Sequence, residues 1–244
     1  MTQNDPLATR FGRRVVATQE RRRLVRDTFA AVAPRYDLMN DLMSFGIHRF
    51  WKRRFAALCA ARPHERIVDL AGGTGDIALL LAAGGARPFV VDPSPEMMAA
   101  GRRRAGAAEL RWIAAEAERL PFADGSVDLA TISFGIRNVT ELGVALREIA
   151  RVLKPGGRFA CLEFSRAHGL IRPGYDLWSR TVIPALGAAV AGRIEAYRYL
   201  IESIRAFPDQ ETFAQALRDA GLAEVSYRNF SFGIAAAHFA RKPA

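Results

Sequence analysis

Short apolar runs alternate with amphipathic stretches along most of the chain after residue 66, and this alternation predicts its regular elements. Brief runs rich in Val, Ile and Leu are typical of buried strands, whereas apolar residues spaced three and four apart are typical of helices. We expect strands over residues 67–70, 88–92, 111–114, 126–133 and 158–164, and two more over about 223–229 and 232–240. Helices are predicted for 142–153 and 212–220, each followed by a glycine stop. The pattern predicts an α/β fold, a doubly wound parallel sheet with its ligand at the carboxyl edge.

The N-terminal region has a different pattern. Residues 1–20 are polar without periodicity, so we expect a mobile arm, and a helix follows from Glu20 to about Ala33, before Pro34. The basic side of this helix has two interpretations of similar weight, a solvated surface over a packed stripe or a surface that faces a membrane or a substrate. Its apolar side holds Leu24, Val25, Thr28, Phe29 and Val32, and its basic side holds Arg21, Arg22, Arg23 and Arg26.

One domain is expected over residues 21–244, because a chain of 244 residues that is half apolar can bury a sizeable core. In residues 36–52, short apolar pairs are interrupted by Tyr, Asp, Asn, Ser and His, which favours a cap over a pocket. We therefore divide the domain into a helical cap segment at 21–60, the sheet core, and an apolar insertion at about 165–205.

The strand at 67–70 runs into a glycine-rich turn, and the next residues predict a helix. This arrangement is typical of the first turn of a βαβ unit, where a ligand lies against backbone amides at a helix N-terminus. Glycine permits positive φ angles and a close approach of ligand to backbone. The residues that we expect at this ligand site are Asp69, Gly72, Gly73, Thr74 and Gly75.

Charge distinguishes the candidate ligands of this turn. The spacing Gly73-x-Gly75-x-x-Ala78 also fits the dinucleotide fingerprint, and a merely tight turn is a third interpretation. Asp69 and Asp76 flank the turn and would repel a pyrophosphate. A ligand with an ammonium and a sulfonium group has the opposite preference, which favours S-adenosylmethionine (SAM).

The second part of this ligand site follows the next strand. Asp92 ends the apolar run at 88–92, where a carboxylate in a βαβ unit can accept hydrogen bonds from both ribose hydroxyls. It can also cap the helix that begins near Pro95, and the two roles are compatible. We predict Asp92 as the ribose ligand.

Composition adds a partner class and a compartment. The formal net charge is +10 and comes almost entirely from arginine, which attracts nucleic acid or an anionic membrane surface without choosing between them. Cys59 and Cys161 offer neither a disulfide framework nor metal-ligand spacing, so a reducing compartment fits and no metal is expected. The first residues lack an apolar signal core, and no apolar run approaches the roughly 18–20 residues that span a bilayer. We expect a cytoplasmic protein, either soluble or peripheral at the inner face of a membrane.

Several separate motifs resemble one enzyme family. They are Tyr36-Asp37-x-Met39-Asn40, Ser44-x-Gly46-x-His48-Arg49-x-Trp51-Lys52, Asp69-Leu70-Ala71-Gly72-Gly73-Thr74-Gly75-Asp76, Leu120-Pro121-Phe122, and the runs at 132–139, 151–157, 162–165, 197–200, 202–204 and 207–210. Together they make the chain similar, from about Arg22 to its C-terminus, to the UbiE/MenG family of ubiquinone and menaquinone biosynthesis C-methyltransferases. The resemblance implies a class I SAM-dependent methyltransferase, with a Rossmann-like, mostly parallel seven-stranded sheet and an N-terminal helical cap. It also implies methyl transfer to a ring carbon of a polyprenylated benzoquinol or naphthoquinol.

The resemblance places SAM contacts at Thr74, Asp92, the pair Glu116-Ala117, and Ser133. Glu116 departs from the family pattern, because similar proteins usually carry Asp or Asn where a short side chain meets the adenine amino group. A glutamate can still accept that hydrogen bond if the backbone retreats by one methylene.

The acceptor side is expected near the end of the 126–133 strand. Arg137 is the first candidate for catalysis, since it could stabilise a phenolate or position a water, and its alternative is a structural ion pair at a strand end. His48 could be a general base or a structural histidine, and Tyr36 could hold the acceptor ring. Cys161 is expected to be a small core residue. The apolar residues between 170 and 193 could line a prenyl tail or form ordinary helix packing.

The motifs and the charge distinguish three function classes. A lipid quinol C-methyltransferase is favoured by the motifs, and an RNA methyltransferase is favoured only by the basic charge, without an appended RNA-binding module. The third class, a non-catalytic SAM-binding or dinucleotide-binding protein, is disfavoured by the intact loop, ribose acid and Arg137-Asn138. The partners expected are a polyprenylated quinol, an anionic membrane surface and other quinone-biosynthesis enzymes, but no nucleic acid.

Overall fold

The computed structural model describes residues 9–11, 14–32, 41, 44, 46–169 and 194–244. Its strands are β1 Arg10–Phe11, β2 Arg14–Val15, β3 Ile67–Leu70, β4 Phe89–Asp92, β5 Arg111–Ala114, β6 Val127–Ser133, β7 Leu153–Phe164, β8 Ala223–Phe230 and β9 Ala235–Arg241. Its helices are α1 Thr18–Val32, α3 Ile47–Cys59, α4 Asp76–Ala83, α5 Pro95–Arg102, α6 Leu142–Val152, α8 Ile194–Ala206 and α9 Gln210–Asp219, with short 3-10 turns η2 Ala107–Glu109, η3 Ile136–Asn138 and η4 Ser231–Gly233.

These elements form a sheet of seven strands in the order β5-β4-β3-β6-β7-β9-β8, beside a small β1-β2 hairpin. Neighbours from β5 to β7 are parallel, and β9 is antiparallel to both β7 and β8. The prediction of a mostly parallel, doubly wound sheet of seven strands is therefore confirmed. The chain goes from β3 to β4 on one side and continues at β6 on the other, so the strand order reverses at β3, where such folds bind their ligands.

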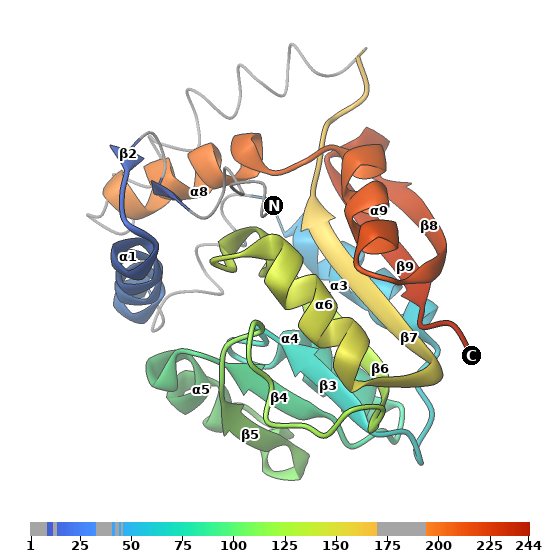
Figure 1. Cartoon of the computed structure of the whole chain (residues 1–244). Coiled ribbons are helices and arrows are strands. Elements are labelled where there is room, and N and C mark those ends of the chain that lie inside the picture. Colours follow the sequence, from blue (N-terminus) through green and yellow to red (C-terminus); the bar gives the residue numbers. More distant parts are fainter. Residues whose placement is uncertain (1–8, 12–13, 33–40, 42–43, 45, 170–193) are drawn as a thin grey trace.

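Two layers of helix cover the sheet (Figure 1), with α6 and α9 in front and α3 and α4 behind. A hydrophobic core lies on each face of the sheet, a front core and a rear core. Because side chains of a strand point alternately to opposite faces, consecutive residues belong to different cores. Leu129 of β6 belongs to the rear core with Trp51 and Phe55 of α3, whereas the next residue, Ala130, belongs to the front core. Each core therefore fixes one layer of helices on the strands that position the ligand site.

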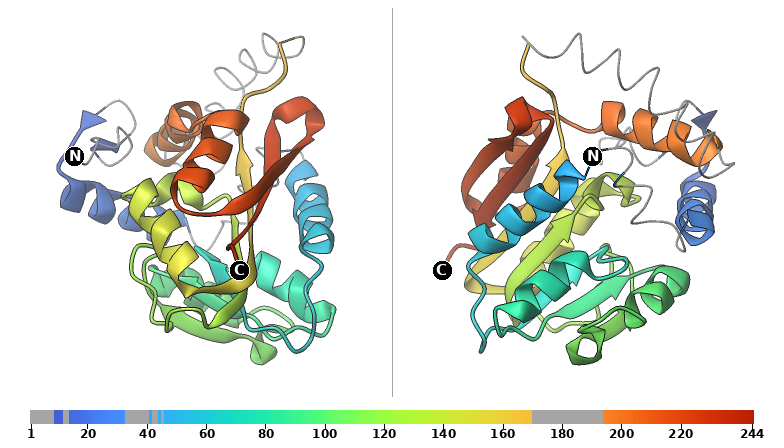
Figure 2. Two further views of the ribbon diagram at one scale, coloured as in Figure 1. Left: turned by 45° about the vertical axis from the view of Figure 1, so that its right-hand side comes forward. Right: turned by 180° about the vertical axis from the view of Figure 1, so that it is seen from behind.

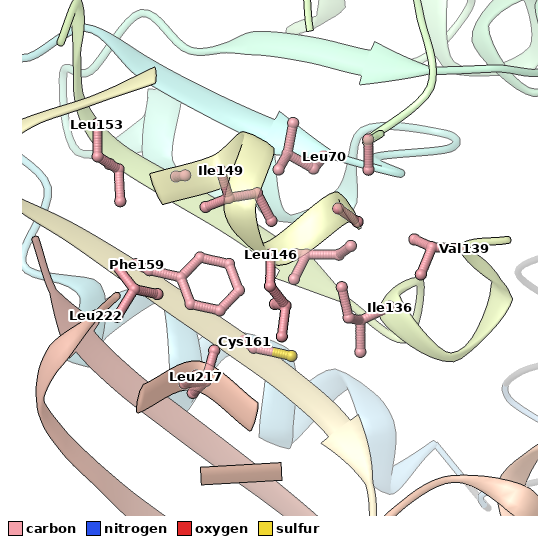
Figure 3. Close-up of a cluster of buried hydrophobic side chains, with 14 of the residues drawn as sticks. Leu70, Ile136, Val139, Leu146, Ile149, Leu153, Phe159, Cys161, Leu217 and Leu222 are labelled. Carbon is pink, nitrogen blue, oxygen red and sulfur yellow. The ribbon is translucent and has the colours of Figure 1, made fainter. Parts of the chain in front are cut away.

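The front core packs the apolar stripe of α6 onto β7. Figure 3 shows Leu146 and Ile149 of α6 near Phe159 and Cys161 of β7, with Leu217 of α9 in the same cluster. Cys161 is a buried free thiol, and burial raises its pKa well above the usual range. The prediction of a small core residue is confirmed for Cys161.

The largest boundary differences from the prediction are at the starts of β7 and β9. α6 ends at Val152, and Leu153 is already extended and pairs with Val127, so β7 begins five residues before the predicted start at residue 158. β9 begins at Ala235 instead of residue 232, because Ser231–Gly233 turn through η4 with positive φ angles.

The described residues before α1 form a small hairpin, and the prediction of a mobile arm at 1–20 falls partly outside the described residues. Residues 10–11 pair with 14–15, Phe11 stacks on Tyr199 of α8 with ring centroids 4.5 Å apart, and Val16 is buried. In the views of Figure 2, the hairpin and α1 lie beside α8 at one end of the sheet. The cap prediction at 21–60 and the insertion prediction at about 165–205 fall partly outside the described residues.

Candidate functional site

A pocket lies between α1 and the carboxyl ends of the parallel strands. It encloses about 920 Å³, including the part open to solvent. One wall is α1, and the opposite wall is made by residues that follow β3, β4, β5 and β6. The lining residues are Arg22, Val25, Arg26, Phe29, Ala71, Asp92, Pro93, Ser94, Met97, Glu116, Ala117, Glu118, Phe134, Gly135, Asn138, Val139 and Thr140.

Asp92 is a buried acid in this lining. Its Oδ2 accepts a hydrogen bond from the amide of Gly73 at 2.8 Å, and its Oδ1 accepts one from the amide of Ser94 at 2.8 Å. Burial raises the pKa of Asp92 to about 6, and the two amide bonds oppose that rise. A carboxylate has more acceptor capacity than these two bonds use, so an ionised Asp92 at neutral pH can bind two vicinal hydroxyls.

The glycine turn supports Asp92 directly. Gly73 and Gly75 have φ angles of 57° and 83°, where other residues are strained. A Cβ on Gly72 would lie 2.7 Å from Cγ1 of Val90, so only glycine lets the turn approach β4 this closely. The glycine turn and the predicted ribose acid therefore form one hydrogen-bonded unit.

The two acids that flank the turn have internal partners. Asp69 accepts hydrogen bonds from Thr131 Oγ1 at 2.8 Å and the Ala78 amide at 3.2 Å, and burial raises its pKa to about 7. Asp76 is also partly buried, but Lys52 and Arg104 pair with it and hold its pKa at about 2. Neither acid lines the pocket, so their predicted repulsion of a pyrophosphate is weaker than the sequence suggested. Asp92 is the buried acid that does line the pocket.

The other predicted SAM contacts lie at the pocket or next to it. Glu116 and Ala117 are in the lining, and Glu116 pairs with Arg22 of α1 at 3.3 Å. Thr74 is buried behind the lining, where its Oγ1 accepts a hydrogen bond from Arg104 at 3.0 Å. Ser133 ends β6, and its buried Oγ has no hydrogen-bond partner among the described residues. Roles in SAM binding for Thr74 and Ser133 stay predictions.

The sequence placed Arg21 on the basic surface of α1, but the structure buries it. Its side chain is 2% exposed and donates hydrogen bonds to the carbonyl oxygens of Val139 at 2.8 Å, Arg137 at 3.3 Å and Asn138 at 3.4 Å. This guanidinium attaches α1 to the turn that follows β6. The helical periodicity showed which side was basic but could not show that a tertiary contact buries one of its arginines.

Arg137 is buried outside the pocket lining and forms an ion pair. Its Nη1 donates to Glu163 Oε1 of β7 at 2.7 Å and to the carbonyl oxygen of Phe134 at 2.6 Å. Burial raises the pKa of Glu163, and Arg137 opposes that rise. These contacts fit the alternative of a structural ion pair, since Arg137 is not in the lining. Its catalytic role stays a prediction.

His48 is buried at the start of α3. Its Nδ1 lies 2.7 Å from Ser44 Oγ, and its Nε2 lies 3.8 Å from Asp41 Oδ1. Burial and the nearby Lys52 lower its pKa to about 4, which makes it a weak base at neutral pH. Tyr36, the third catalytic candidate, lies outside the described residues.

Sequence reasoning missed several lining residues. Met97 of α5 and Thr140 belong to no motif, and Asn138 and Val139 end the family run at 132–139 without having been assigned to a ligand. Val25 and Phe29 could have been found from their spacing of four on α1, which was noted as a stripe but was not assigned to a ligand.

The comparisons with known proteins agree with this architecture. A sequence model described as the ubiE/COQ5 methyltransferase family matches residues 15–242. The chain is 57% identical to a ubiquinone/menaquinone biosynthesis C-methyltransferase UbiE of Rubrivivax gelatinosus, over 100% of this chain and 97% of that one. It is 50% identical to the protein of the same name from Paracoccus denitrificans, over 98% of each chain.

Solved structures show the same fold at low sequence identity. A chain of the complex between the Haloferax volcanii Trm112 methyltransferase activator and a methyltransferase has a TM-score of 0.67 and 21% identity, over 90% of this chain and 98% of that one. A SAM-dependent methyltransferase of Thermotoga maritima has a TM-score of 0.65 and 20% identity, over 89% and 99%. These structures support a class I SAM-dependent methyltransferase fold. With a family match over nearly the whole chain and relatives at half identity or more, this chain belongs to the ubiE/COQ5 methyltransferase family.

Proposed function

We propose that the protein is a SAM-dependent C-methyltransferase that methylates a ring carbon of a polyprenylated benzoquinol, demethylmenaquinol or both, in ubiquinone and menaquinone biosynthesis. The observation that supports this most strongly is the pocket at the carboxyl edge, lined by Asp92 and Glu116, in a chain of this family. The names of the UbiE relatives supply the class of acceptor.

The chemistry of the lining fits SAM. Asp92 offers acceptors to ribose hydroxyls, and Glu116 offers one to an adenine amino group. Met97 and Phe29 supply apolar surface for the flat base between these acids and α1. The lining holds three acids, Asp92, Glu116 and Glu118, and two arginines, Arg22 and Arg26, of which Arg22 pairs with Glu116. The buried Asp92 suits a ligand with positive centres better than it suits a phosphate.

The reaction needs alignment more than a strong catalytic group. SAM supplies an electrophilic methyl group, and the nucleophile is a quinol ring carbon made electron-rich by the neighbouring hydroxyl. Holding two reactants in line can supply much of the rate enhancement. Phe134 and Val139 provide apolar walls that exclude water, and the buried pair of Arg137 and Glu163 fixes the turn on which those walls stand.

Binding to a membrane surface is part of the proposal, because a polyprenyl tail resides in the bilayer. Among the residues described, no helix is long and apolar enough to cross a membrane. A net charge of +10 would favour an anionic surface, since each cation close to such a surface contributes about 1 kcal/mol.

Quinone profiling tests the proposed pathway in cells. A strain without this gene should accumulate a quinone that lacks one ring methyl group, and the wild-type gene should restore the methylated form. An Asp92→Ala gene that is expressed at the wild-type level should fail to restore it. An unchanged quinone profile in the deletion strain, with no second methyltransferase gene of this family present, would contradict the proposal.

A further inference from the structure

Three of the large apolar side chains that are exposed in the described part of the chain lie on two elements, α3 and η4. Ile47 and Phe50 are on α3 and are 40% and 61% exposed, and Phe232 is in η4 and is 74% exposed. We call these three residues the apolar tip. Single exposed apolar residues are common on protein surfaces, whereas a group at one functional edge points to an interaction.

A hydrogen bond joins the two elements that carry the apolar tip. Trp51 Nε1, one turn into α3, donates a hydrogen bond to Ser231 Oγ of η4 at 3.0 Å. η4 precedes Ala235, which pairs with Phe164 at the carboxyl end of β7. η4 therefore lies at the edge of the sheet where the pocket is, and the hydrogen bond ties α3 to it.

The backbone of Phe232 supports a role for its side chain. Its φ and ψ angles are 56° and 33°, a left-handed conformation that is unfavourable for a bulky residue and is better suited to Gly or Asn. Such strain is usually maintained by function or by burial, and the ring of Phe232 is largely exposed. An apolar environment outside the protein would stabilise the exposed ring of Phe232.

Aromatic contacts connect the apolar tip to the pocket. Trp51 has its ring centroid 6.3 Å from that of Phe134, which lines the pocket. The ring centroid of Phe164 is 4.6 Å from that of Phe134 and 6.2 Å from that of Trp51. These buried and half-buried rings form a continuous packing contact from α3 to the pocket wall, with Lys52 over Phe134 and Arg137 over Phe164.

The charge around the apolar tip indicates its partner. Arg53 and Arg54 are exposed on α3, whereas Arg49 pairs with Asp41 at 2.5 Å. His48 is held neutral by a pKa of about 4. Aromatic residues flanked by arginines suit the interface of an anionic bilayer.

We propose that Ile47, Phe50 and Phe232 insert into the interface of an anionic membrane and turn the pocket toward the lipid that holds the quinol. This inference rests on the proposed function, since it requires a substrate with a membrane-resident tail. It differs from attraction by charge alone, because it places two aromatic rings below the lipid headgroups.

A single-cysteine label tests the insertion. Phe232→Cys can be labelled selectively with an environment-sensitive dye, because Cys59 and Cys161 are buried and burial raises their thiol pKa values. Vesicles that contain phosphatidylglycerol should shift the emission of the label to the blue, and lipids brominated near the headgroup should quench it. The control is the same label on Tyr227→Cys, on the outer strand β8, whose emission should change little.

Vesicle sedimentation measures the contribution of each ring. Phe232→Asn suits the left-handed backbone, and Phe50→Ser changes an exposed helix position, so both variants should fold. Each should weaken binding to anionic vesicles by about tenfold, and salt should weaken the remaining binding. Methylation of a short-tailed, water-soluble quinol should stay at the wild-type rate in both variants.

Other outcomes would overturn the inference. Wild-type vesicle binding by both variants would show that the apolar tip does not insert, while retained methylation of the soluble quinol would leave the proposed function intact. A wild-type dimer that Phe232→Asn dissociates in the absence of lipid would assign the surface to a second copy of the chain. Absence of methylation in the wild-type protein would refute the proposed function, whatever the vesicles show.

Discussion

Replacing Arg137 distinguishes a structural residue from a catalytic one. The guanidinium is 3% exposed and its partner Glu163 is 1% exposed, so Arg137→Ala leaves a carboxylate buried without its counter-ion. Breaking a buried pair from one side costs about 3–5 kcal/mol. For a domain of about this size, each kcal/mol lowers the unfolding midpoint by about 2–4 °C, so we expect a fall of about 6–20 °C.

A double variant separates stability from chemistry. Replacing both partners by apolar residues of similar size is often neutral, so Arg137→Met with Glu163→Met should unfold close to the wild-type midpoint. Because Arg137 is not in the pocket lining, this variant should also bind SAM and retain methyl transfer within about tenfold of the wild type, where a tenfold loss corresponds to 1.36 kcal/mol of barrier.

Calorimetry of unfolding, calorimetry of SAM binding and quinol turnover are the measurements. An unchanged midpoint in Arg137→Ala would refute the structural role of the ion pair. A stable double variant that binds SAM but does not transfer methyl would show that Arg137 acts on the acceptor, as the sequence first suggested.

The remaining predictions concern the SAM pocket. Affinity for SAM should fall as the pH drops through about 6, because Asp92 then binds a proton and loses the charge that attracts the ribose hydroxyls. Calorimetry on Asp92→Asn should show weaker SAM binding that does not change across this pH range. The same fall in affinity in that variant would assign the pH dependence to another group. Arg21→Met should release α1 and weaken SAM binding, since a hydrogen bond from a charged group contributes about 1.5–3 kcal/mol. The matched control is Arg23→Met, at a side chain that is 70% exposed. Equal SAM affinities in the two variants would contradict the attachment of α1 by Arg21. Glu116→Ala should weaken SAM binding by about fivefold, or roughly 1 kcal/mol for a partly exposed hydrogen bond. A SAM analogue with inosine in place of adenosine lacks the amino group, so it should bind equally to the wild type and the variant. Weaker binding of this analogue to the variant than to the wild type would mean that Glu116 does not contact the amino group.

The sequence predicted the parts of the fold that local patterns determine. The strands from β3 to β6 and the turn at Gly73 and Gly75 were found because buried strands and glycine turns have strong local signals. Asp92 lies in the pocket lining because it ends the strand that leads there, and its role as ribose ligand stays a prediction. Family motifs then supplied the acceptor class, which the pocket alone does not reveal.

Other features depend on contacts between distant segments. The partner of Arg137 is 26 residues away, and the carbonyl groups that accept hydrogen bonds from Arg21 are 116 to 118 residues away. No periodicity along the chain records such pairs. Asp69 illustrates the same limit, because the hydroxyl of Thr131 that occupies its carboxylate comes from the neighbouring strand.

The most direct test of the central claim is the position of the transferred methyl group. The purified protein should be incubated with SAM labelled with ¹³C at the methyl carbon and a reduced demethylated quinol, and the product analysed by NMR and mass spectrometry. We predict one labelled methyl group on a ring carbon and one equivalent of S-adenosylhomocysteine. A label on a hydroxyl oxygen, or no transfer by a protein that binds both SAM and the quinol, would contradict the account.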